Sequence, residues 1–179
     1  MKKYRESLID DNIGYLQQAL TLLQQMNDDL YGKIIPLAFG SGVGQHLRHC
    51  LDHYESFLAG WQTGKIDYDA RTRDTRIETD RQYALAHIAT IIAALRQLEE
   101  KDEDRQVEVK QDSSPAHETA PAWSATTVRR ELQFLVSHTV HHYALIAMIL
   151  RLHGFEPHPD FGVAPSTLKH RQALQACAQ

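Results

Sequence analysis

The feature that most constrains the fold of this chain is an apolar repeat at helical spacing that recurs in four long segments. The repeat is clearest from Ile77 to about Glu100, where successive apolar residues lie three, four or seven positions apart. Such steps place the apolar side chains on one face of an α-helix, and a second helix must cover that face to bury it. The sequence therefore predicts an all-α fold, a four-helix bundle.

The other long helices are expected on either side of this segment. The first covers Tyr4 to Tyr31 and the second Val43 to Trp61, with Ser41 as a plausible N-cap of the second. The fourth begins after Thr126 or Thr127, either of which can cap it, and ends at Gly154. These bounds predict that residues 1–179 form a single domain, with the bundle over residues 4–154.

The remaining segments are expected to connect or cover the helices. Residues 65–76 are polar and predict a solvated loop, although Arg71, Arg73 and Arg76 leave an anion-binding rim open as an alternative. Residues 101–125 predict a short hairpin or an ordered loop. Residues 155–179 predict a capping tail with a short helix.

Composition and charge exclude several classes of protein. The chain has 19 Lys and Arg against 23 Asp and Glu, without a basic block, which argues against binding to nucleic acid or to an anionic membrane. Its start lacks the apolar core of a signal peptide, and no later run is apolar enough to span a bilayer. Cys50 and Cys177 are far apart and form no zinc-ribbon spacing. We therefore expect a cytoplasmic protein.

The histidines are the unusual component of this sequence. Six of the eleven lie in two windows of 8 and 5 residues, where a random distribution would place about one. Histidines that lie close together in a sequence typically bind a metal, transfer protons or act as a pH switch. The clustered residues are His46, His49, His53, His138, His141 and His142.

Two of these histidines belong to the apolar face of the last long helix. His138 and His142 are one turn apart and share an arc with Leu135 and Ile149. A buried neutral imidazole without a partner costs about 1–3 kcal/mol, so two of them need a common cause. Spacing i, i+4 allows both rings to reach one ion, at about 2.0–2.1 Å for zinc.

The further ligands must come from a neighbouring helix, and residues 43–61 offer His46, His49 and His53 on consecutive turns. On a helical wheel, His46 and His53 lie at the edge of the apolar face and His49 lies further round. The wheel alone therefore favours His46 or His53.

Both histidine segments resemble a known family. The segment Gly44-Gln-His-Leu-Arg-His-Cys-Leu-Asp-His53 and the segment His138-Thr-Val-His-His142, followed by Arg151 and Gly154, are similar to the motifs of the DinB-like metalloprotein superfamily. That superfamily includes bacillithiol S-transferases, the mycothiol-dependent maleylpyruvate isomerase and the amino-terminal domain of the ergothioneine sulfoxide synthase.

The resemblance implies a ligand set and a topology. By this resemblance, the histidine pair of the family motif corresponds to His138 and His142. The single histidine of the motif on the second helix corresponds to His49, with His53 and then His46 as substitutes. It also implies an up-down-down-up four-helix bundle, often a homodimer, that holds a divalent ion with three imidazoles. We expect a divalent metal ion such as Zn, Ni, Fe or Mn, and the ligands do not identify it, because imidazole suits zinc, iron, copper and nickel alike.

Three protein ligands with an exchangeable position are typical of a catalytic site. By the resemblance, the ion would bind a low-molecular-weight thiol as its thiolate for an S-transferase reaction. A metal-dependent hydrolase, a non-catalytic metal-binding or stress-response bundle, and a pH-responsive interaction bundle without metal are the alternatives.

Some residues depart from the family pattern. His46, His53 and His141 are extra, and His141 is expected on the flank of its helix. Asp52 and Glu131 could orient or join the ligands, and a second, weakly bound ion is an alternative. The alternative to metal binding is a pair of core histidines hydrogen-bonded to such carboxylates. The other histidines have no partner at useful spacing, and we assign them no function: His87, His117, His153, His158 and His170.

Overall fold

The computed structural model describes residues 7–36, 40–112 and 122–177. Its helices are α1 Leu8–Gln25, α2 Asp28–Tyr31, α3 Val43–Gly60, α4 Arg76–Thr79, α5 Arg81–Leu95, the 3-10 helix η1 Glu100–Asp104, α6 Val128–Leu152 and α7 Pro165–Cys177. Its strands are β1 Ile34–Ile35, β2 Ser41–Gly42, β3 Lys65–Asp67, β4 Gln106–Lys110 and β5 Ser124–Thr127.

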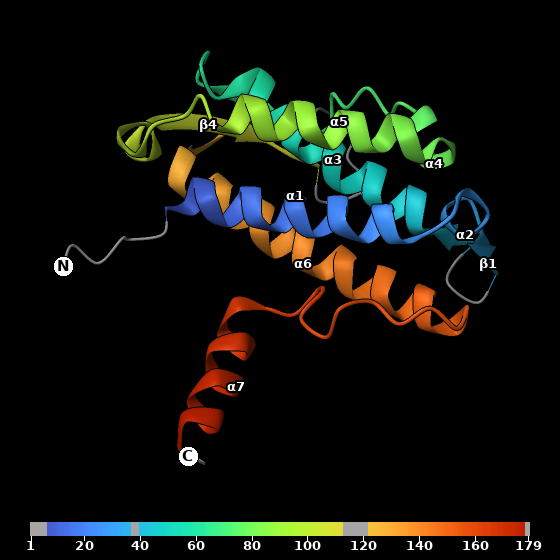
Figure 1. Cartoon of the computed structure of the whole chain (residues 1–179). Coiled ribbons are helices and arrows are strands. Elements are labelled where there is room, and N and C mark those ends of the chain that lie inside the picture. The colour runs from blue at the N-terminus through green and yellow to red at the C-terminus, as the bar shows by residue number, and fades with distance from the viewer. Residues whose placement is uncertain (1–6, 37–39, 113–121, 178–179) are drawn as a thin grey trace.

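The four long helices pack side by side (Figure 1). Helix α1 contacts α5 and α6, and α3 also contacts α5 and α6. Their apolar faces meet in one core, in which Leu16, Leu51, Ile88 and Leu135 are fully buried. The chain is therefore mostly helical, as predicted, but the expectation of an all-α fold leaves out two small sheets.

Two of the predicted helices are interrupted by residues that cap a new helix. Within the expected helix 4–31, Asn27 leaves the helical conformation and its side chain accepts a hydrogen bond from the backbone of Leu30, which starts α2. Within the expected helix 77–100, Asp80 caps α5 in the same way, and α5 ends at Leu95. The apolar repeat is compatible with such short breaks, so it could not reveal them.

The ends of α3 and α6 test the predicted caps. Ser41 is not the N-cap of α3, because Gly42 takes that position and its backbone N–H is bound by the side chain of Gln45. Thr127 caps α6 as expected, accepting from the backbone of Arg130. Gly154 follows α6 with φ at +77°, a conformation that favours glycine.

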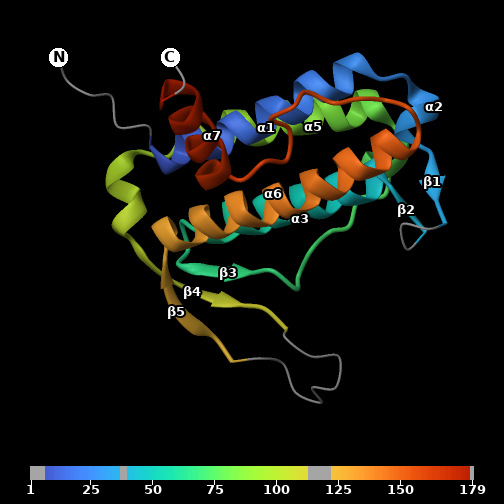
Figure 2. The same cartoon turned by 90° about the horizontal axis from the view of Figure 1, so that it is seen from below.

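A three-stranded sheet lies beside α3 and α6 (Figure 2). Strands β4 and β5 pair antiparallel, which confirms the predicted hairpin, and β3 pairs parallel with β4. The expectation that residues 65–76 form only a solvated loop is wrong for β3, where Ile66 and the following Tyr68 are buried. This sheet places Tyr68 next to the histidines described below.

A buried polar network joins three of the long helices. The side chain of Asn12 on α1 donates to the backbone oxygen of Leu132 on α6 and accepts from the hydroxyl of Tyr54 on α3. Thr139 on α6 donates to the same hydroxyl. Because buried polar groups need these partners, the network fixes α3 against α6 at the level of the histidines.

The C-terminal segment covers the core only in part. Phe161 is buried and stacks on Tyr143 of α6 at a centroid distance of 4.6 Å. The predicted short helix is present as α7, but Figure 1 shows it projecting from the long helices, and no described side chain of α7 is buried.

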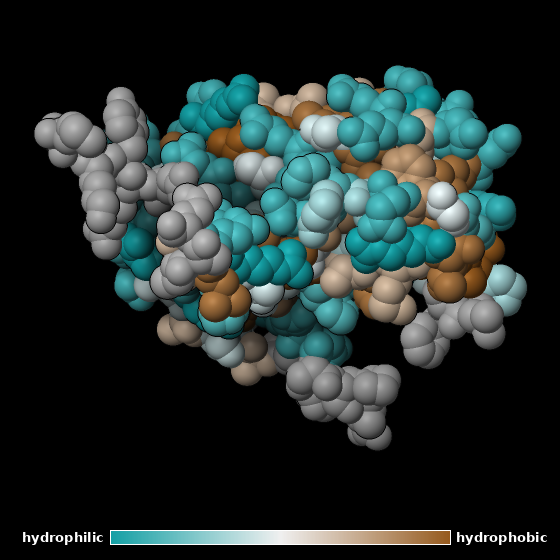
Figure 3. Space-filling view, turned by 60° about the horizontal axis from the view of Figure 1, so that its bottom comes forward, coloured by the Kyte–Doolittle hydropathy of each residue, from teal (hydrophilic) through white to brown (hydrophobic). Residues whose placement is uncertain are grey.

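The exposed hydrophobic residues lie mainly on α6 and α7. On the face drawn in Figure 3, hydrophobic side chains occur in separate patches between hydrophilic ones. Leu152, expected on the apolar face of its helix, is instead 64% exposed, as is its neighbour one turn earlier, Met148, at 59%. Among the described helices, none is long and apolar enough to cross a membrane.

Candidate metal centre

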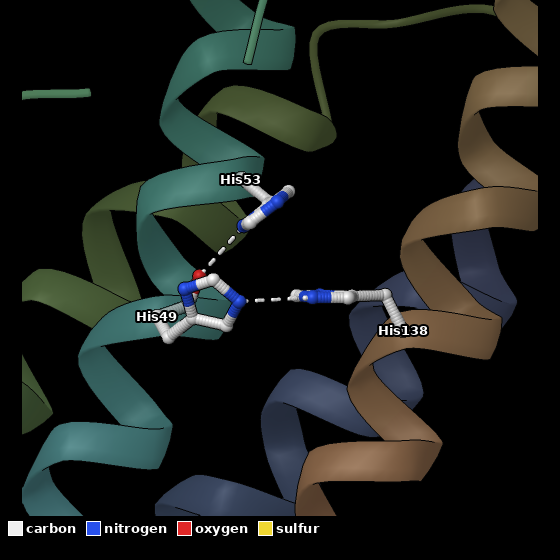
Figure 4. Close-up of side chains that lie close together, drawn as sticks. All are labelled: His49, His53 and His138. Atoms are coloured by element: carbon white, nitrogen blue, oxygen red, sulfur yellow. Dashed lines mark hydrogen bonds between the residues drawn. The ribbon is translucent and has the colours of Figure 1, made fainter. Parts of the chain in front are cut away.

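Helices α3 and α6 bring five histidines into one cluster. His46, His49 and His53 come from consecutive turns of α3, and His138 and His142 come from consecutive turns of α6. Figure 4 shows three of them, His49, His53 and His138, with their rings turned toward one another across the space between the two helices. The sequence-based expectation that the two histidine windows meet therefore agrees with the structure.

The distances within this cluster suit a shared cation. Nε2 of His138 lies 3.2 Å from Nε2 of His49. Two nitrogens bound to one tetrahedral zinc ion at about 2.0–2.1 Å are separated by about 3.3 Å. One ring nitrogen from each of His49, His53 and His138 lies within 4.8 Å of the others, a group that could hold a metal ion.

His53 is the most deeply buried of the five, with 2% of its surface exposed. Its Nδ1 lies 2.8 Å from the backbone oxygen of His49, which can only accept, so Nδ1 carries the proton. The lone pair of the ring is then on Nε2. This is the arrangement of a metal-binding histidine, whose second nitrogen is held by a carbonyl.

His142 and His46 form the outer part of the cluster. The Nδ1 atoms of these two residues are 3.0 Å apart, and Nε2 of His46 lies 3.0 Å from the hydroxyl of Ser41. The ring of His142 is also close to the rings of His49 and His138, at centroid distances of 4.7 and 4.6 Å. His142 is thus adjacent to the inner three residues, while His46 contacts it from the outside.

Burial keeps these imidazoles neutral. It lowers the pKa of His138 to about 2, that of His142 to about 3 and that of His49 to about 4, and the neighbouring histidines contribute in the same direction. Burial also lowers the pKa of His53 and that of His46. A metal ion binds neutral imidazole, so this environment selects the form that binds cations.

Arg71 adds a contact that constrains the protons of the cluster. Its Nη1 lies 3.2 Å from Nδ1 of His49, and because a guanidinium can only donate, that nitrogen accepts. Neutral His49 then carries its proton on Nε2, and this N–H donates a hydrogen bond to Nε2 of His138. His138 in turn carries its proton on Nδ1, which is buried without a hydrogen-bond partner among the described residues.

This arrangement opposes an ion at Nε2 of His49, because the ring would then need its proton on Nδ1, facing Arg71. The Arg71→Met protein, which keeps the aliphatic stem, should therefore bind zinc about fivefold more tightly, as about 1 kcal/mol of opposition is removed. Competition titration with a zinc chelator would measure this. Arg73→Met, on the same segment, is the control, and an unchanged affinity in Arg71→Met would contradict the argument.

The low pKa values also predict how the metal-free protein responds to acid. In the unfolded chain these histidines take up protons near pH 6.5, whereas in the folded protein His49, His142 and His138 do so only near pH 4 and below. The unfolded state therefore binds more protons between these values, and stability must fall as the pH drops from about 7 to 4. Urea denaturation in the presence of chelator should show this fall, and His138→Gln should reduce it.

The remaining candidates lie elsewhere. His141 is exposed, as expected for the flank of its helix. Asp52 pairs with Arg48, and Glu131 accepts hydrogen bonds from Tyr68 and Thr126, so neither carboxylate takes the expected place beside a histidine.

The other histidines contribute no ligand. His87 pairs with Glu55 at 2.8 Å, a partner that its sequence spacing did not suggest. His117 lies outside the described residues. The structure supports no role in the cluster for His153, His158 and His170.

Sequence reasoning missed two neighbours of the cluster. Tyr68 stacks on the ring of His53 at 5.4 Å and donates to Glu131, and no pattern in the sequence marked it. Arg71 belonged to the basic segment that was weighed as an anion-binding rim, but its contact with His49 depends on how residues 68–76 fold back over α3.

Comparison with known proteins decides the family. Residues 16–146, well over half of the chain, match the model of the DinB superfamily, and the match includes all five clustered histidines. The chain belongs to the DinB superfamily. The resemblance seen in the two histidine motifs is thereby confirmed, and a possible histidine metal site is in keeping with this DinB protein.

A second similarity is more limited. Over 107 residues, the DinB chain is 31% identical to FK506-binding protein 5 of Rhizopus delemar. The match covers 59% of this chain but only 27% of that protein, so the chain spans about a quarter of its relative's length. What that longer protein does is therefore not carried over to this chain.

Proposed function

We propose that this DinB protein binds one divalent metal ion through histidines of α3 and α6 and uses it to activate a low-molecular-weight thiol for S-transfer. The observation that supports it best is the contact of His49 with His138, at a separation suited to two ligands of one ion. Membership of the DinB superfamily and the neutral, buried state of the rings also support it.

The ligand set follows from which rings converge, and an ion at Nε2 of His49 requires the proton of that ring to move to Nδ1, toward Arg71. His49 and His138 belong to every candidate set. His53, with its proton fixed on Nδ1, completes a group of three in the present geometry, and His142 completes the set that the family motif implies. Three ligands would leave a position for a substrate, whereas four would close the site. We propose three, with His53 and His142 as the competing third ligands.

The chemistry of such a centre is the stabilisation of a thiolate at neutral pH by the bound cation. The protein's own residues would hold the rings neutral, exclude water with the aromatic side chains of Tyr68 and Phe134, and fix the His53 tautomer. The fine topology belongs to the same proposal: a single domain built on an up-down-down-up four-helix bundle, acting as a homodimer.

The test combines elemental analysis with a reaction screen. Untagged protein should contain about one divalent ion per chain. It should also consume a low-molecular-weight thiol that contains cysteine in the presence of an electrophile such as monochlorobimane. Metal without thiol consumption would favour the non-catalytic or the hydrolytic alternative, which an ester and amide screen separates. Absence of stoichiometric metal would overturn the proposal.

A further inference from the structure

One exposed side of α6 carries no charged residue over about five turns of the helix. Residues 132–150 contain no Asp, Glu, Lys or Arg, although 23% of the whole chain is charged. The exposed positions in this segment and just after it follow one another at steps of three or four residues, so they share one side of the helix. They are Gln133, Ser137, His141, Ala144, Met148 and Leu152. We call this set the α6 face.

The α6 face ends in two large hydrophobic side chains that water surrounds. Met148 and Leu152 are more than half exposed, and Leu174 on α7 and Ile34 are the other large hydrophobic residues that the described part of the chain exposes. Helix α5 also has an uncharged outer side, but its exposed residues between positions 86 and 93 are only Ala and Thr. Exposed apolar side chains that gather in one place mark interaction sites, which favours α6 over α5.

Helix α7 projects from the same side of the molecule. The chain passes α6 so closely at Gly162 that a Cβ there would lie 2.6 Å from the backbone nitrogen of Ala144, so α7 begins beside the middle of the α6 face. Figure 1 shows α7 extending from there beyond α6, away from α5. A helix of 13 residues is only marginally stable alone in water, and no described side chain of α7 is buried. Contacts with another molecule would stabilise it.

We propose that a second copy of this chain covers the α6 face, with the two α6 helices antiparallel about a two-fold axis near Ala144 and each α7 lying against the partner. An uncharged face meets its own copy without like-charge repulsion, and the small Ala144 lets the two helices approach closely. The α6 face is about 30 Å long and about 10 Å wide, or about 300 Å². A stable interface needs about 800 Å² on each partner, so the contact must include α7. This inference rests on the homodimer of the proposed function and names its surface.

Sedimentation velocity of the full chain over a dilution series tests the proposal. The unaltered protein should sediment as two chains, with or without chelator. Met148→Glu brings two like charges into the contact and should raise the dimer dissociation constant at least about a hundredfold, while zinc binding stays unchanged. His138→Ala should show the opposite pattern, with zinc binding lost and the dimer kept, so the metal centre and the α6 face can fail separately. A monomeric unaltered chain would overturn the inference.

Further variants locate the contact. Leu174→Glu on α7 should also weaken the dimer, whereas Ala89→Glu, at an exposed position on the uncharged side of α5, should leave it unchanged. Ala144→Cys in a Cys177→Ser background should form a disulfide between two chains when diamide is added, and Ala89→Cys in that background should not. Dissociation by Ala89→Glu, full dimerisation of both Met148→Glu and Leu174→Glu, or no cross-link through Ala144→Cys would refute the assignment.

Discussion

The His138→Ala protein should bind zinc at least about a hundredfold more weakly than the unaltered chain. His138 is common to both candidate ligand sets, and its Nε2 lies 3.2 Å from that of His49. Loss of a group that merely orients a ligand already costs about 10–100-fold in metal affinity, so loss of a ligand should cost at least the upper value. Competition with a chromophoric chelator at pH 7.5 measures the change.

The neighbouring histidines provide the control and the discrimination. His141→Ala removes an exposed imidazole three residues away and should leave the affinity unchanged. Comparison of His53→Ala with His142→Ala then identifies the third ligand, because only its loss should approach the effect of His138→Ala. If His138→Ala retained full affinity, the cluster would not be the metal centre.

The sequence was informative about this cluster because helical spacing is a strong constraint. Once residues 128–152 form a helix, His138 and His142 must share a face, and the apolar residues around them determine that this face points inward. The same spacing predicted the long helices, while capping preferences predicted Thr126 or Thr127 as the N-cap of α6 and Gly154 at its end; the structure has Thr127 in the cap and a positive φ at Gly154.

Helical spacing could not predict in the same way which of the three α3 histidines approach α6. The wheel favoured His46 and His53, and the family motif favoured His49, yet in the structure all three approach α6. Each imidazole reaches several ångströms from its helix, so residues at the edge of a face can still converge. Which rings meet then depends on side-chain rotamers and on how closely α3 and α6 approach.

The contacts that loop residues make could not be predicted from the sequence either. Strand β3 is three residues long and pairs with β4, about forty positions later, so its existence depends on a tertiary contact rather than on a local pattern. The placements of Tyr68 and Arg71 follow from that pairing. Short breaks at Asn27 and Asp80 were missed because a capping residue on a polar face leaves the apolar repeat unchanged.

The second large effect concerns the close contact between Gly44, near the start of α3, and the backbone of Glu78 in α4. The Gly44→Ala protein should be about 2–3 kcal/mol less stable, because overpacking a tight contact costs about 1–3 kcal/mol and this one involves backbone that cannot rotate away. A Cβ at Gly44 would lie 2.1 Å from the backbone oxygen of Glu78 and 2.7 Å from its carbonyl carbon. Helix α4 would have to move, and with it Ile77, which is fully buried.

Gly14→Ala is the matched control for this effect. Gly14 is also inside a long helix, but a Cβ there would meet nothing within 4 Å. Alanine should therefore stabilise the protein by about 0.5–1 kcal/mol through its higher helix propensity. Urea denaturation of both variants compares the same Gly→Ala substitution at two positions, where the expected changes in the free energy of unfolding have opposite signs. Equal stability changes would contradict the close contact of α3 with the backbone of α4 at Gly44.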